Sequence, residues 1–134
     1  PPSFLFTKKA IQVCAAFELT TSATAPTSTV RFKFDTTVIA ATGALASGNS
    51  VTSRQYNYCV VIQGTVAAGA AVSVEAGGFH ALGMGGTASP NTIDQPVAAG
   101  DLTIARTVQI SWQWGAATTG NTAQLHQFSV TELR

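Results

Sequence analysis

The acidic residues are the first candidates for catalysis, and they are few and scattered. The carboxylates are those of Glu18, Asp35, Glu75, Asp94, Asp101 and Glu132. A glycosidase holds two carboxyl groups within about 10 Å of each other, but no two of these acids form a pair that is local in the sequence. Most of them fall in turn-like segments or at outward strand positions, which indicates solvated charges. We therefore expect no catalytic residues and no enzymatic activity.

The two histidines, His80 and His126, are the next candidates, because imidazoles bind transition metals. Their spacing matches no zinc pattern, and no pair of cysteines lies near either of them. We therefore expect no metal ligands within one chain and no cofactor. A hypothesis remains for an assembly: if three chains met around an axis, one His80 from each could form a shared ion site, which metal analysis would detect.

Five residues could contact a ligand or a partner, because they lie in segments without a regular pattern. These residues are Asn49, Phe79, His80, Met84 and Asn121. The segments are 42–53, 77–90 and 115–122, and long irregular loops often carry binding functions. Segment 77–90 is rich in glycine but lacks the lysine of a phosphate-binding loop. Phe79 is the only aromatic residue in the three segments, so they offer little surface for stacking a sugar ring.

Alternating apolar and polar residues predict the strands that would position these loops. The strand-like segments are residues 9–19, 29–34, 38–41, 54–64, 71–76, 92–97, 102–113 and 123–133. Their apolar positions, which form the expected core, include Ile11, Val13, Ala15, Phe17, Leu19, Val30, Phe32, Phe34, Tyr56, Tyr58, Val60, Ile62, Val108, Ile110, Trp112 and Trp114. Helical periodicity is nearly absent. About eight strands with one apolar face each predict an all-β fold, an antiparallel β-sandwich of the jelly-roll type.

The last strand-like segment contains an irregularity. Leu125 is out of phase with Phe128 and Val130, so a regular strand could not point all three side chains to one side. A β-bulge near His126 or Gln127 would reconcile them, because a bulge adds one residue to one strand of a pair.

The two cysteines, Cys14 and Cys59, both lie inside strand-like segments. A secreted domain held together by disulfides would contain more cysteines at closer spacing. We expect two buried free thiols, because free cysteine behaves as a small core residue. A Cys14–Cys59 bridge between facing strands is the alternative.

The composition indicates a surface that is covered by other protein. Charged residues make up 10% of the chain, whereas about 25% is usual in soluble domains. The net charge of +1 offers no field for nucleic acid or an anionic membrane, and no apolar run approaches the roughly 20 residues of a membrane span. We therefore expect a homo-oligomer or a protein packed into a larger assembly, with no nucleic-acid partner and no membrane partner.

The chain divides into a short N-terminal arm, residues 1–8, and one domain, residues 9–134. The arm opens with two prolines, from which we expect a fragment or a processed product. It also contains Phe4, Leu5 and Phe6 before the first clear strand. Two interpretations are open: these residues anchor the domain to a neighbour, or they add an edge strand.

The last third of the chain resembles the C-terminal jelly-roll segment of structural proteins from tailed-phage virions. In residues 91–133, an apolar strand ends in a W-x-W pair, a short loop with Asn follows, and an apolar strand ends in E-L. The matching residues are Trp112, Gly115, Asn121, Thr122, Val130, Glu132 and Leu133. Residues 31–45, 54–64 and 77–80 are similar to upstream units of the same group, so the resemblance covers about residues 9–133. Its motifs are strand-and-turn patterns, and segment 77–90 departs from them.

The resemblance implies a jelly-roll domain, commonly trimeric, on the surface of the virion, where such domains serve as capsid decoration proteins, head fibres or tail-fibre tips. The implied partners are further copies of the chain and other virion proteins of the capsid or tail. The alternative is a module at a fibre tip that binds a receptor or a host-surface glycan. The group has no catalytic residues to transfer to this chain.

Overall fold

The computed structural model describes residues 9–22, 26–64, 72–82, 89–90, 97–100, 104–116 and 118–133. These residues form β-strands and turns and contain no helix. The strands are β1 (Ala10–Thr20), β2 (Thr27–Phe34), β3 (Thr37–Ala41), β4 (Leu45–Ala46), β5 (Arg54–Gly64), β6 (Val72–Leu82), β7 (Ser89–Pro90), β8 (Val97–Gly100), β9 (Val108–Trp114) and β10 (Thr122–Leu133). The prediction of an all-β chain is confirmed.

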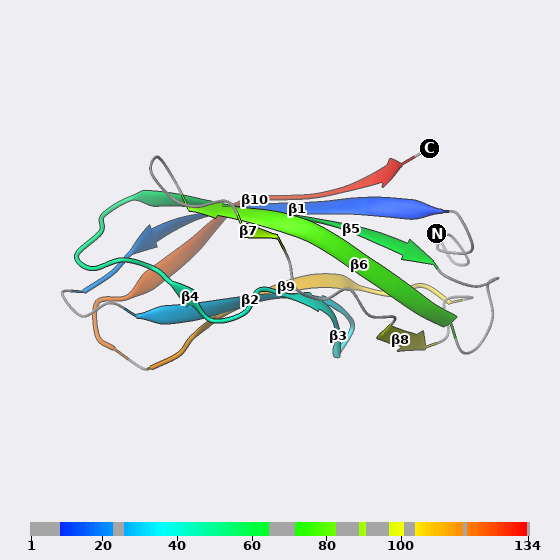
Figure 1. Cartoon of the computed structure of the whole chain (residues 1–134), viewed down its shortest axis with the longest axis horizontal. Coiled ribbons are helices and arrows are strands. Elements are labelled where there is room, and N and C mark those ends of the chain that lie inside the picture. Colours follow the sequence, from blue (N-terminus) through cyan, green and yellow to red (C-terminus); the bar gives the residue numbers. More distant parts are fainter. Residues whose placement is uncertain are drawn as a thin grey trace.

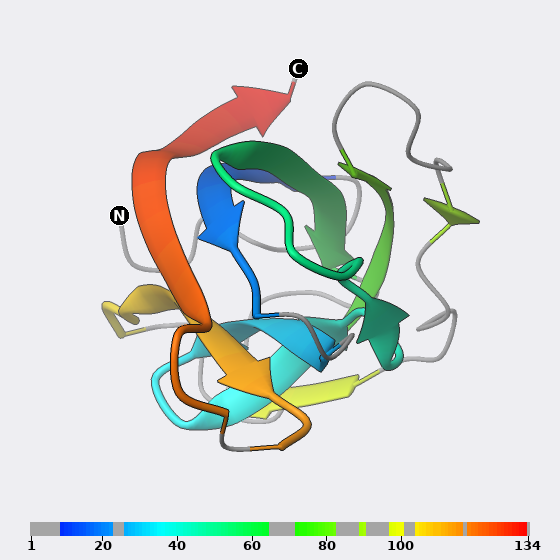
Figure 2. The same cartoon turned by 90° about the vertical axis from the view of Figure 1, so that its left-hand side faces the viewer.

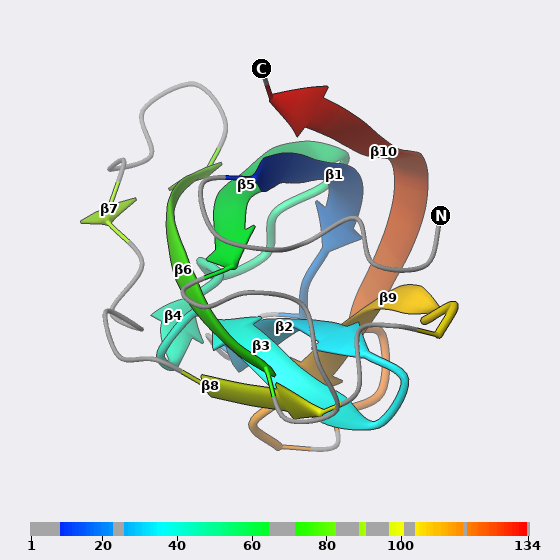
Figure 3. The ribbon, with the colours of Figure 1, turned by 90° about the vertical axis from the view of Figure 1, so that its right-hand side faces the viewer.

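Two antiparallel sheets pack face to face, which confirms the predicted β-sandwich (Figures 1 and 3). The first sheet has the order β10-β1-β5-β6-β7, and β8 pairs with β6. In the second sheet, β2 pairs with β3, β4 and β9. Among the described strands, β10 is therefore the outermost strand of the first sheet on one side, and β9 has the corresponding place in the second sheet.

The alternation along the strands decides which side chains fill the space between the sheets. Every second residue of β1 and β5 is buried, and so is every second residue of β2. The buried apolar residues are Ile11, Val13, Ala15, Phe17, Leu19, Val30, Phe32, Phe34, Ile39, Ala40, Tyr56, Tyr58, Val60 and Ile62. The rings of Phe32 and Tyr58 stack across the two sheets with their centroids 4.8 Å apart. Burial of these apolar faces is the main force that holds the sheets together.

Strand β6 is longer than the sequence predicted. We expected a strand over residues 71–76 and an irregular loop over 77–90, but β6 continues to Leu82, and β7 forms at residues 89–90. The physical reason is pairing: β5 is long enough to bond β6 along its whole length, from Gly64 opposite Val74 to Tyr56 opposite Leu82. Main-chain hydrogen bonds to a neighbouring strand do not require the side-chain pattern that the glycines interrupt.

The boundaries of the other strands differ less from the predicted ones. β9 begins at Val108, six residues later than the start of the segment 102–113, and residues 104–107 precede it without strand structure. The weak strand expected over residues 92–97 lies almost entirely outside the described residues, and β8 begins at Val97. A short strand, β4, forms within the segment 42–53 that we expected to be a loop.

The expectation of free thiols was wrong, because Cys14 and Cys59 form a disulfide. The two residues are direct partners on the neighbouring strands β1 and β5, and their Cα atoms are 4.1 Å apart. Both lie at half-buried positions that alternate with the core residues, so they face away from the second sheet. Cysteine hydrophobicity favoured a core position, but the register between β1 and β5 places the two sulfur atoms next to each other.

The predicted bulge in the last strand is confirmed. β10 pairs with β1 so that Gln127 lies opposite Ala16 and Leu125 lies opposite Phe17, and His126 is the extra residue between them. Beyond the bulge, Phe128 and Val130 lie opposite Ala15 and Val13. Since direct partners in an antiparallel pair point to the same face, Leu125, Phe128 and Val130 share the face of β1 that points to the core.

Asp35 connects the β2–β3 turn to the segment before β9 by hydrogen bonds. Its backbone has a φ of 51°, a left-handed conformation that Asp adopts more readily than most residues. Its carboxylate accepts hydrogen bonds from Arg106 Nη1 at 2.8 Å and from the N–H of Thr107 at 3.0 Å. The bond from Arg106, with that from Thr107, holds the pKa of Asp35 below its ordinary value.

We expect this contact to make the stability depend on pH in the acidic range. Because the pKa of Asp35 is lowered in the folded chain, its contribution is complete above the ordinary value of 3.8 and disappears as the pH falls through the lower, folded value. The melting temperature of the wild-type chain should therefore fall more steeply below about pH 4 than that of Asp35→Asn. Asparagine tolerates the same φ but carries no charge. Parallel curves for the two proteins would contradict this prediction.

Candidate functional site

Two of the predicted loop segments meet at one end of the sandwich. The N–H of Ser50 donates to the carbonyl of Ser22 at 2.7 Å, and the N–H of Ser22 donates to Asn121 Oδ1 at 2.9 Å. Ser22, which follows β1, is therefore bonded both to the loop before β5 and to the turn before β10, so Asn49 and Asn121 lie at the same end of the sandwich. Asn49 is exposed, whereas Asn121 is half-buried and its amide oxygen holds Ser22. The geometry therefore gives Asn121 a structural role.

Phe79, His80 and Met84 are the other predicted ligand residues. Phe79 and His80 lie within β6, where they pair with Cys59 and Tyr58 of β5, so their assignment to an irregular loop was wrong. Met84 lies outside the described residues, and so do Phe4, Leu5 and Phe6 of the N-terminal arm.

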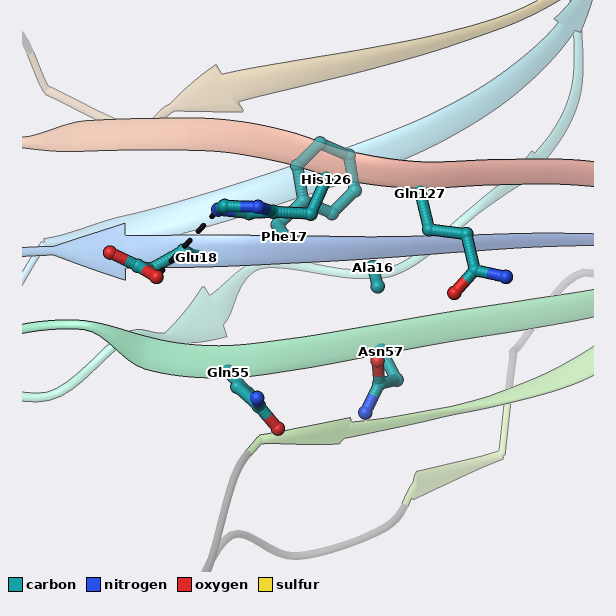
Figure 4. Close-up of a pocket in the computed structure, with 7 residues that line it drawn as sticks. All are labelled: Ala16, Phe17, Glu18, Gln55, Asn57, His126 and Gln127. Carbon is teal, nitrogen blue, oxygen red and sulfur yellow. Dashed lines mark ion pairs between the residues drawn. The ribbon is translucent and has the colours of Figure 1, made fainter.

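A polar hollow, which we call the outer groove, lies on the side of the first sheet that faces away from the second (Figure 4). It is lined by Ala16, Phe17, Glu18, Gln55, Asn57, His126 and Gln127, from β1, β5 and β10. The small Ala16 lies between Asn57 on one neighbouring strand and Gln127 on the other. A methyl group between two longer side chains leaves the space that forms the hollow.

The bulge supplies one wall of the outer groove. His126 is the extra residue of β10, and both His126 and Gln127 line the groove (Figure 4). His126 Nε2 lies 3.6 Å from Glu18 Oε2, and Ser53 Oγ donates a hydrogen bond to Glu18 Oε1 at 3.0 Å. Both members of the Glu18–His126 pair are about half exposed, so their attraction is weak in water.

The chemistry available in the outer groove is hydrogen bonding. Gln55, Asn57 and Gln127 each offer an amide donor and an amide acceptor, and Glu18 adds a carboxylate. Glu18 is the only carboxylate in the lining, so the two-carboxylate arrangement of a glycosidase is not present there. These side chains can donate hydrogen bonds to a polar ligand and accept hydrogen bonds from it.

A second surface lies on the opposite face of β10, and we call it the open side. It consists of Leu125, Phe128 and Val130, which are 44%, 38% and 47% exposed although they point in the same direction as the core residues of β1. Large apolar side chains exposed together often mark an interaction surface. The open side follows the outer edge of the first sheet, where β10 bends along the flank of the sandwich (Figure 2).

The open side lies on the flank where β10 and β9 are the outermost described strands of their sheets and do not pair with each other. β9 contributes Trp112 to the core, where its ring lies against Phe17 of β1 and Tyr56 of β5, at centroid distances of 5.0 and 5.3 Å. Since no described strand pairing closes this flank, the side chains of Leu125, Phe128 and Val130 remain partly accessible to solvent. Phe128 still reaches the border of the core, 6.4 Å from Phe32 between ring centroids.

Neither surface was identified from the sequence. The outward polar residues Glu18, Gln55 and Asn57 had the ordinary pattern of solvated strand positions, and nothing local shows that they surround Ala16. The phase break at Leu125 did predict the bulge, and it was the one available signal for both surfaces. The extra residue of the bulge puts His126 and Gln127 together on one face of β10, and it puts Leu125 on the same face as Phe128.

In the part of the chain that the structure describes, no group of three or more His, Cys, Asp or Glu side chains could hold a metal ion. The same residues contain no helix long and apolar enough to cross a membrane. No protein-family model, no curated protein sequence and no solved structure matches this chain.

Proposed function

We propose that this chain is a structural component of a virus particle, a jelly-roll domain on the virion surface that acts by associating with copies of itself and docking to other virion proteins of the capsid or tail. The observation that carries the self-association is the open side. Exposure of Leu125, Phe128 and Val130 to water is unfavourable, and contact with another protein surface removes it. The assignment to a virion rests on the resemblance of residues 91–133 described above.

The composition supports association of this kind. With 10% charged residues, most of the outward side chains are neutral, and neutral side chains can enter an interface at a lower desolvation cost than charged ones. The disulfide between Cys14 and Cys59 further suits a particle exposed to an oxidising exterior, where such bonds persist. Both features support a role that depends on packing and durability.

The solution mass of the purified chain tests self-association. We expect light scattering to show a mass of at least twice the 13.8 kDa of one chain at high protein concentration. Three times that mass would correspond to the trimer that the resemblance implies. A mass of one chain at every concentration tested would contradict self-association, and the open side would then need a different virion protein as its partner.

A second candidate function is the binding of a host-surface glycan, and the outer groove is the observation that favours it. Its amides could hydrogen-bond the hydroxyl groups of a sugar, although Phe17 is the only Phe, Tyr or Trp in its lining and is buried. A glycan array tests this function. Reproducible binding should be lost in Asn57→Ala and retained in Gln63→Ala, which changes another exposed amide of β5 outside the groove.

A further inference from the structure

We propose that two copies of this chain join edge to edge through β10, in antiparallel orientation, so that the first sheet continues from one copy into the other across a two-fold axis. This inference rests on the proposed function, because it identifies the partner that covers the open side as a second copy of the same chain. Such a contact is self-complementary, as a two-fold interface requires.

The outer edge of β10 is suited to pairing with another strand. In the part of the chain that the structure describes, β10 pairs with β1 and with no other strand. It is the longest described strand, at 12 residues, and it contains no lysine and no proline. Long edges without such residues are prone to pair with another strand. One acidic residue, Glu132, is the only permanent charge on β10, so little repulsion opposes pairing with an identical strand.

The hydrogen bonds between β5 and β1 determine which main-chain groups of β10 point outward from this edge. The N–H of Gly64 donates to the carbonyl of Lys9 at 3.2 Å, so this pair exchanges hydrogen bonds between β5 and β1. In an antiparallel pair, bonded and non-bonded positions alternate. Odd-numbered residues of β1 therefore direct their main-chain groups to β5, and even-numbered ones, such as Cys14, direct theirs to β10.

The separation of the two disulfide-bonded residues agrees with this alternation. Their Cα atoms, 4.1 Å apart, have the close spacing of a pair that does not exchange main-chain bonds. Cys14 instead bonds its partner on β10, Ser129. Since the alternation continues along β10, Phe128 and Val130 direct their N–H and C=O groups away from β1.

Phe128 and Val130 combine outward main-chain groups with side chains of the open side. With Ser129 on the two-fold axis, Phe128 of each copy lies opposite Val130 of the other, so an aromatic and a β-branched side chain face each other twice, a favourable cross-strand pair. A register shifted by two residues places Phe128 opposite Glu132, which brings a carboxylate against the ring. Of these two registers, the one centred on Ser129 avoids the contact between the carboxylate and the ring.

The size of the contact sets the expected strength. Stable interfaces bury about 800 Å² on each partner, and the three partly exposed side chains of the open side supply only part of such an area. We therefore expect a dimer that dissociates on dilution. Dimerisation should be seen as a rise in light-scattering mass from 13.8 kDa toward twice that value with increasing concentration.

Hydrogen exchange of the wild-type chain provides the decisive test. The amides of Phe128 and Val130 should exchange slowly at concentrations where the dimer forms and quickly where the mass is that of one chain. The amides of Ser129 and Thr131, which bond β1 in both states, should change much less. If Phe128 and Val130 remain protected at the mass of one chain, a segment of the same chain covers the edge, and the proposal is overturned.

Two variants test the contact independently. Val130→Pro removes an outward N–H and leaves the bonds to β1 in place, so we expect it to shift the mass to one chain without loss of the fold. Val130→Lys places a charge on the open side and should do the same if the proline variant does not fold. Thr131→Lys, whose side chain lies on the opposite face, is the matched control and should remain dimeric.

The outcomes separate this inference from the proposed function. A wild-type mass of one chain at every concentration overturns pairing through β10 together with self-association, and leaves docking to other virion proteins as the remaining part of the proposed function. A closed trimer, or a dimer that persists in both Val130 variants, overturns pairing through β10 and leaves self-association standing. A dimer that is lost in the Val130 variants, retained in Thr131→Lys and accompanied by the expected exchange pattern supports both.

Discussion

Replacement of both Cys14 and Cys59 by serine should lower the free energy of unfolding by about 4 kcal/mol. The disulfide joins residues that are 45 positions apart, and a cross-link that closes a loop of this length restricts the unfolded chain strongly. Without it, the unfolded state gains conformational entropy, while the folded state keeps the pairing of β1 with β5. Urea denaturation of the wild-type chain and the double variant measures the difference.

The control for this experiment is a double variant of the neighbouring pair on the same strands. Gln12 and Val61 are direct partners at the next outward position, and neither takes part in a cross-link. Their replacement by serine should change the stability by less than about 1 kcal/mol. Wild-type protein treated with a reducing agent should behave like the variant lacking both cysteines. Equal urea midpoints for the oxidised and reduced wild-type protein would contradict the prediction.

Phe32→Ala should be similarly destabilising, by about 3–5 kcal/mol. Phe32 is completely buried at the centre of β2, and its ring stacks on Tyr58 of the opposite sheet with an interplanar angle of 19°. Alanine removes this contact and leaves a cavity between the sheets, because the surrounding strands are held in place by their own pairing and can close only part of the space.

Lys33→Ala is the matched control for Phe32→Ala, since Lys33 is the next residue of β2 and its half-buried side chain faces away from the core. We expect it to change the free energy of unfolding by less than about 0.5 kcal/mol. Thermal or urea denaturation of the two variants measures both values. A loss below about 1 kcal/mol for Phe32→Ala would mean that the two sheets do not depend on this stacked pair.

The strands that form the centre of the sandwich could be predicted because their burial pattern is local. In β1, β2 and β5, the inward positions carry apolar residues apart from Ser28, and the outward positions carry polar, charged or small residues apart from Val61. A strand has a side-chain period of two, so the pattern alone shows which face is buried. The bulge of β10 followed from the same rule, because Leu125 breaks the period in a way that one extra residue repairs.

Pairing between distant segments could not be predicted in the same way. Residues 77–82 belong to β6 because β5 offers a bonding partner to each of them, and their own glycines conceal this. Cys14 and Cys59 form a disulfide because the register of β1 and β5 places them directly opposite each other. A shift of that register by one residue would separate the sulfur atoms, and nothing in either strand alone specifies the register.

The sequence by itself determined the fold class, the core faces of the central strands and the irregularity of β10, since each depends on neighbouring residues and a fixed period. The tertiary structure alone decided which of the apolar faces are covered. Leu125, Phe128 and Val130 have the same pattern as buried residues, but they are exposed because β10 is an edge strand of the first sheet and does not pair with β9, the neighbouring edge strand of the second. Burial depends on the second sheet as well as on the strand, and the extent of a sheet is set by contacts between segments far apart in the chain.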